Sequence, residues 1–256
     1  MLILALLFLV TALLYASVGF GGGSTYNALL VLADTDYRIL PSVALACNLI
    51  VVAGGVWQYR RSGQLSVGFA LPFVALSIPM AWFGGSVPIQ RQTFVLLLGL
   101  SLLAAGIAMW FQPSQTKASR PRNAMINWLV GVPLGGAIGF LSGMVGVGGG
   151  IFLAPALHLL RLAEPKRIAA TSSFFIMVNS IAGLVGQTMK HGSMAHLSKL
   201  SDYVWLIAAV LLGGQIGSHL GTRVMSERSI KRMTGALVIY VGARLLWLTV
   251  AGSGNL

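Results

Sequence analysis

Long stretches without a single charged residue constrain this chain more than any other feature. With Asp, Glu, Lys and Arg counted as charged, uncharged runs cover residues 1–33, 39–59, 62–90, 92–116, 123–160, 168–189 and 203–222. In a last run, 233–256, Arg244 is the single charged residue. A helix needs about 20 residues to cross the hydrocarbon of a bilayer, and each run reaches or exceeds that length. With 56% hydrophobic and 9% charged residues, the 256-residue chain lacks the charged surface of a soluble domain. The sequence therefore predicts an all-α polytopic membrane protein surrounded by the lipid bilayer.

The charged residues that remain exclude several functions. The 17 basic and 5 acidic residues give a net charge of +12. The basic residues stand in short segments between apolar runs, where they set membrane topology and do not form a nucleic-acid surface. Cys47 is the single cysteine, and the four histidines have no metal-ligand spacing. We therefore expect no nucleic-acid partner, no metal and no cofactor, and the sequence leaves the oligomeric state open.

An internal repeat organises the chain. The segment Val18–Gly23 (VGFGGG) recurs as Val145–Gly150 (VGVGGG), 127 positions later. At a spacing of 129, Arg38-Ile39 matches Arg167-Ile168, Gly54 matches Gly183, Gln58 matches Gln187, and Gly84-Gly85 matches Gly213-Gly214. The sequence predicts two pseudosymmetric repeats of about four apolar segments each. They comprise an N-terminal repeat (1–112) and a C-terminal repeat (123–256), joined by a polar linker (113–122).

The glycine triplets predict a break in the first segment of each repeat. The runs 1–33 and 123–160 are too long for one span and too short for two spans with a loop. Each glycine lowers helix propensity by about 1 kcal/mol relative to alanine, so the helix should stop and restart there. Unwound backbone at membrane depth is tolerated only where it is buried in protein or lines a cavity.

The basic residues distinguish two topologies. If every segment crosses the membrane, the two sides receive seven and nine basic residues. If each broken segment is instead a re-entrant hairpin, the division is twelve against four, which is a strong positive-inside signal. The hairpin model predicts inverted repeats with both termini outside a bacterial inner membrane. Full spans remain the alternative.

Two restarting helices would form an anion site. A helix N-terminus presents unpaired N–H groups and a positive dipole end, which transporters with internal repeats place near the membrane midplane. The candidates at the breaks are Gly21, Gly22, Gly23, Ser24, Thr25 and Asn27 in the first repeat and Gly148, Gly149 and Gly150 in the second.

Uncharged polar side chains on the following segments extend this candidate site. Ser172, Asn179 and Gln187 lie on one helical stripe, and Asn48 and Thr171 are further candidates. Amides and hydroxyls bind an oxyanion without a charge that would hinder its release. The alternative is structural: small residues allow close helix packing, and polar residues form hydrogen bonds between helices.

The two glycine elements carry a family resemblance. SVGFGGGSTYNALLVL (17–32) and GMVGVGGGIFLAPALHLL (143–160), followed by RIAATSSFFIMVNSIAGLVGQ (167–187), resemble the sulfite exporter TauE/SafE family, also called TSUP. The resemblance implies a duplicated helical core and transport of sulfur-containing anions such as sulfite, organosulfonates or related organic acids. We expect a secondary transporter or facilitator, without enzyme activity, that exports its substrate by alternating access. The alternatives are an anion channel, a structural subunit, or an intramembrane hydrolase that uses Ser142 with His158 or His219.

Overall fold

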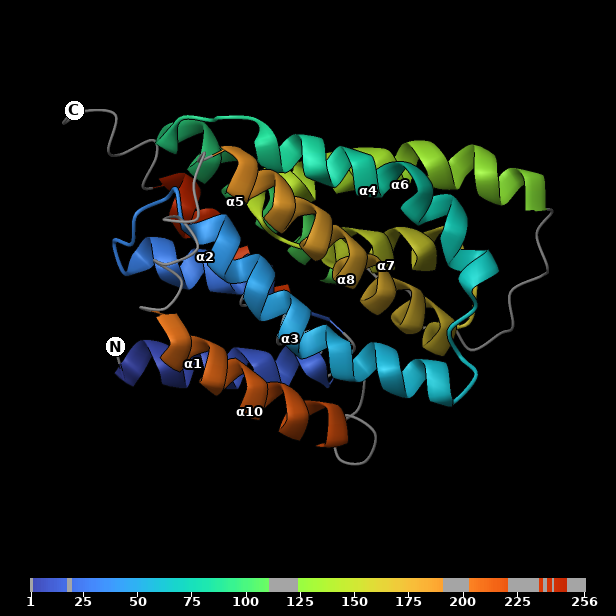
Figure 1. The fold of residues 1–256 in the computed structure, drawn as a ribbon, viewed down its shortest axis with the longest axis horizontal. Coiled ribbons are helices and arrows are strands. Elements are labelled where there is room, and N and C mark those ends of the chain that lie inside the picture. Colours follow the sequence, from blue (N-terminus) through green and yellow to red (C-terminus); the bar gives the residue numbers. More distant parts are fainter. Residues whose placement is uncertain are drawn as a thin grey trace.

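The chain folds into a bundle of α-helices (Figure 1). The computed structural model describes residues 2–17, 20–110, 124–190 and 203–220, together with 235–236, 239–240 and 242–247. The helices are α1 (Leu2–Ala16), α2 (Gly23–Leu32), α3 (Leu40–Arg61), α4 (Val67–Ser86), α5 (Arg91–Trp110), α6 (Ala124–Val145), α7 (Gly150–Leu159), α8 (Pro165–Lys190) and α10 (Val204–Leu220). No strand occurs within these ranges. The predicted linker 113–122 lies outside the described residues.

Five of the described helices, α3, α4, α5, α6 and α8, are long and apolar enough to cross a membrane. Many of their large apolar side chains are exposed, Trp57, Leu71 and Leu129 among them. In water such a surface would be unfavourable, whereas in a bilayer it contacts acyl chains. The prediction of a polytopic helical membrane protein is confirmed.

Both glycine triplets interrupt a helix. α1 ends at Ala16 and α2 begins at Gly23, while α6 ends at Val145 and α7 begins at Gly150. The residues that precede the restarted helices, Gly22 and Gly149, have φ angles of 84° and 78°. This left-handed conformation is costly for any residue with a Cβ atom, so glycine is required where the chain turns into α2 and α7.

Each break also reverses the direction of the chain. In Figure 1, α1 runs away from the end marked N and α2 returns toward it, while α6 and α7 make the same reversal from the opposite end. Contacts between helices agree with this view. Arg38, after α2, lines the same pocket as Lys190 at the end of α8. Arg167, after α7, lies over the ring of Phe69 at the start of α4, 5.0 Å from its centroid. These positions favour the hairpin model over full spans, and the inverted repeat remains a prediction.

The two halves of the sequence interleave. The most extensive helix pairs, α4 with α6, α4 with α8, α1 with α10 and α3 with α8, all join one half to the other. One example is the pair of α1 and α10, in which Gly213 and Gly217 approach the carbonyl oxygens of Leu9 and Leu13. The core is therefore shared between the halves.

A row of glycines brings α4 and α6 together. Gly131, Gly135, Gly139 and Gly143 recur every fourth residue along α6, and a Cβ atom on any of them would collide with α4. For Gly135, Gly139 and Gly143 the obstacle is a backbone carbonyl of α4, from Phe73, Ser77 and Ala81. Small residues at this spacing let two backbones approach closely in a membrane. The glycines of α6 thus allow close helix packing, whereas the glycine triplets allow the chain to turn at the breaks.

Candidate functional site

The two breaks meet inside the bundle, at Asn48 on α3. The Asn48 Oδ1 atom accepts a hydrogen bond of 2.8 Å from the backbone N–H of Gly23, the first residue of α2. The Asn48 Nδ2 atom donates one of 3.2 Å to the carbonyl of Val147, within the second break. Asn48 is fully buried. One carboxamide therefore joins the start of α2 to the chain between α6 and α7.

Asn27 makes a second connection between the breaks. From the second turn of α2, its Nδ2 atom donates to the carbonyls of Val145 at 2.8 Å and Gly146 at 3.2 Å. The last carbonyls of a helix have no partner within the helix, so this amide caps α6. Gln187 on α8 also caps the last turn of α6, because its Nε2 atom donates to the carbonyl of Gly143, two residues before Val145, at 2.9 Å.

The restarted helices retain unpaired donors. Among the residues that the structure describes, the backbone N–H groups of Ser24, Gly150 and Ile151 have no hydrogen-bond partner. All three residues are buried. Buried donors without partners are costly, and at a helix N-terminus they are suited to an anion.

An apolar side chain lies between the breaks. A methyl group added to Gly21 or Gly148 would come within 3.2 Å or 2.9 Å of the Ile176 Cγ2 atom, and one added to Gly150 would collide with the end of the same side chain. Ile176 is 2% exposed and lies on α8 in the stripe that carries Ser172 and Asn179. The sequence analysis did not identify Ile176, because an apolar residue in an apolar run gives no signal.

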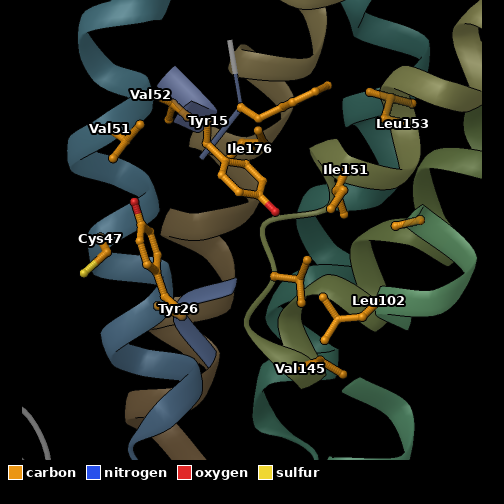
Figure 2. Close-up of a cluster of buried hydrophobic side chains, with 14 of the residues drawn as sticks. Tyr15, Tyr26, Cys47, Val51, Val52, Leu102, Val145, Ile151, Leu153 and Ile176 are labelled. Carbon is orange, nitrogen blue, oxygen red and sulfur yellow. The ribbon is translucent and has the colours of Figure 1, made fainter. Parts of the chain in front are cut away.

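The tyrosines of the first hairpin add one polar contact and one stacking contact. The Tyr15 hydroxyl and Thr25 Oγ1 share a hydrogen bond of 2.8 Å, so Thr25 ties α2 to the end of α1. Tyr26 stacks on Phe8, with ring centroids 4.7 Å apart. Figure 2 shows Tyr26 beside Cys47 of α3, in the cluster that also contains Tyr15, Ile151 and Ile176. The sequence analysis missed Tyr15, whose position ten residues before Thr25 becomes informative only once the hairpin is known.

Several polar side chains of α8 are buried and have hydrogen-bonding atoms without a partner among the described residues. The Thr171 and Ser172 hydroxyls and the Asn179 Oδ1 atom have no hydrogen-bond partner among the described residues. The Asn179 amide donates to the Phe175 carbonyl of its own helix at 2.9 Å. Asn48 and Asn179 thus differ in role, since only Asn48 bridges the breaks. Whether these residues bind a substrate remains a prediction.

The residues considered for catalysis or metal binding form no site in the described part of the chain. The buried Ser142 hydroxyl has no hydrogen-bond partner there, so it forms no dyad with His158. No cluster of three or more potential metal ligands occurs among the described residues. The side chain of His219 lies outside the described part of the structure.

A bundle of apolar helices that encloses two broken ones, with helix N-termini facing inward, is an architecture found in membrane transporters. The chain belongs to the sulfite exporter TauE/SafE family, which matches residues 3–245. It is a membrane transporter and an integral protein of the bacterial inner membrane.

Relatives from bacteria and an archaeon carry similar names. The "probable membrane transporter protein y4hK" of Sinorhizobium fredii is 32% identical over 252 residues, covering 95% of this chain and 97% of the relative. The "probable membrane transporter protein YunE" of Bacillus subtilis is 26% identical over 279 residues, covering 96% and 97%. A probable membrane transporter protein of Methanocaldococcus jannaschii is 25% identical over 262 residues, covering 97% and 96%. No solved structure matches the chain.

Proposed function

We propose that this transporter moves small sulfur-containing anions, such as sulfite, an organosulfonate or a related organic acid, outward across the membrane. Its site is the meeting point of the two breaks, which opens alternately to each side. The observation that carries the proposal is the convergence of two helix N-termini, with unpaired N–H groups at Ser24, Gly150 and Ile151, around Asn48. Export of an anion from a cell that is negative inside is favoured by about 2.3 kcal/mol per charge per 100 mV, so it needs no coupling ion.

Asn48 takes a specific part in this proposal. Its Oδ1 atom accepts from the Gly23 N–H, which is the position an oxygen of the anion would occupy. An entering anion therefore competes with a neutral carboxamide for the same donor. The exchange of one acceptor for another keeps the cost of binding and release low, as turnover requires.

The transport assay uses purified protein in liposomes with a membrane potential. Sulfite, thiosulfate, sulfoacetate, taurine and simple carboxylates are compared as substrates. We expect saturable flux of at least one sulfur-containing anion and little flux of the carboxylates. Flux that never saturates, or single-channel currents, would identify an anion channel. An absence of sulfur-anion flux, with the protein folded and inserted, would refute the proposal.

Replacing Asn179 with leucine tests the polar stripe of α8. The Asn179 amide bonds only to its own helix, so the substitution should leave the melting temperature close to that of the wild type. We expect the initial rate of substrate flux to fall several-fold, because leucine removes the Nδ2 donor from the stripe. Unchanged flux in Asn179→Leu would remove this residue from the site. Asn27→Leu is less informative, because it also uncaps α6.

A further inference from the structure

A pocket of about 160 Å³ opens at one end of the bundle, beside the segment that joins α2 to α3. Its walls come from that segment, from the segment between α4 and α5, and from the end of α8. Among the described residues that line it, two are cations, Arg38 and Lys190, and none is acidic. The two cations belong to opposite halves of the sequence.

The two cations are placed differently. The Arg38 side chain is exposed and lies beside Tyr37, with its guanidinium carbon 5.8 Å from the ring centroid. A hydrogen bond with the Tyr37 side chain raises the pKa of Arg38, so the guanidinium stays charged. Lys190 is half-buried. The nearby carboxylate of Asp36 accepts the backbone N–H of Arg38 at 3.1 Å and does not line the pocket. The walls therefore present positive charge at the opening.

The inner lining of the pocket reaches the second break. Pro41 and Met144 both line it. Met144 precedes Val145, whose carbonyl binds Asn27. Pro41 packs against Gly146 so closely that a Cβ atom on this glycine would collide with the Pro41 backbone. The lining of the pocket is therefore in direct contact with the second break.

We propose that this pocket is the vestibule through which a small oxyanion reaches or leaves the breaks, and that Arg38 and Lys190 attract the anion there. The class of substrate is taken from the proposed function. The new element is the location of the entrance on one side of the membrane. A volume of about 160 Å³ suits a small anion with some of its water. Positive walls raise the local concentration of an anion and its rate of entry.

Thiol labelling tests the vestibule without requiring transport. Cys47 is first replaced by alanine, and Met144→Cys then places a thiol on the inner lining. Ile89→Cys, at another lining position, serves if Met144→Cys fails to fold. Anionic and cationic methanethiosulfonate reagents are applied from one side of liposomes made of phosphatidylcholine. The ratio of the two labelling rates is divided by the ratio at Ala33→Cys, an exposed position at the end of α2, on the same side of the membrane as the pocket.

We expect the anionic reagent to label the thiol of Met144→Cys faster than the cationic reagent does. Labelling should occur from one side of the membrane only. Arg38→Gln and Lys190→Gln should each reduce this preference about fivefold, the effect of losing one nearby charge in water. Arg91→Gln is the matched control, because Arg91 is an exposed cation near the same pocket but does not line it. It should change the ratio less than about twofold, because its charge is farther from the labelled thiol.

Three results would overturn the vestibule. The first is no preference for the anionic reagent, and the second is an equal effect of Arg91→Gln, which would indicate diffuse surface charge. The third is a preference that appears only when phosphatidylglycerol is added, since the cations would then bind lipid headgroups. Charge-dependent labelling without any sulfur-anion flux would leave the vestibule standing and refute the proposed substrate.

Discussion

Replacing Asn48 with leucine should abolish transport and destabilise the protein. Leucine has a similar volume but leaves the Gly23 N–H and the Val147 carbonyl without partners. Each unpaired buried group costs about 1–3 kcal/mol, so we expect a loss of about 2–6 kcal/mol in the free energy of unfolding. We also expect the initial rate of flux to fall at least about tenfold, the effect of 1.4 kcal/mol on a barrier. Thermal unfolding in detergent and flux into liposomes measure the two effects.

Asn179→Leu is the comparator for stability. Both asparagines are fully buried on membrane-length helices, but the Asn179 amide bonds only to the Phe175 carbonyl one turn earlier. Asn48→Leu should therefore lower the melting temperature much more than Asn179→Leu. Equal losses in the two variants would mean that the bridge between the breaks contributes nothing specific to stability.

Replacing Gly135 with valine should prevent α4 and α6 from packing. A Cβ atom at Gly135 would overlap the Phe73 carbonyl oxygen and lie 2.8 Å from the Phe73 carbonyl carbon. Overpacking a core costs about 1–3 kcal/mol, and here the obstacle is backbone, which cannot rotate away. We expect Gly135→Val to lower the free energy of unfolding by about 3 kcal/mol or more. Size-exclusion chromatography should show aggregate in place of the folded peak.

The matched control is Gly68→Val on α4. Nothing lies within 4 Å of a Cβ atom built on Gly68. Valine and glycine differ little in helix propensity, so this variant should fold and elute like the wild type. If Gly135→Val behaved in the same way, the close approach of α4 and α6 would not be needed for the fold.

The positions of the breaks were predictable because their cause is local. Three glycines in a row end a helix whatever surrounds them, and α2 and α7 begin at the third glycine, Gly23 and Gly150. The distribution of basic residues likewise favoured hairpins, because topology depends on charge summed along the chain. The helical membrane class followed from the uncharged runs alone.

The partners of the polar residues could not be predicted. Asn27 and Asn48 were chosen as donors to a substrate, yet in the structure their Nδ2 atoms bind backbone carbonyls 118 and 99 residues away. An amide gives the same sequence signal whether its partner is an anion or a distant carbonyl. The glycine row of α6 was visible in the sequence, but a spacing of four does not reveal which helix lies opposite.

The position of the Ile176 side chain between the two breaks bears on how the membrane potential of the cell is maintained. An energised membrane cannot tolerate a pore that stays open, because ions flowing through it would discharge the potential. At the proposed site, the branched hydrocarbon side chain of Ile176 offers an anion no hydrogen-bond donor, and an apolar constriction repels ions. In the proposed mechanism an anion therefore passes only when α8 or one of the breaks moves, so the protein and not diffusion sets the turnover rate.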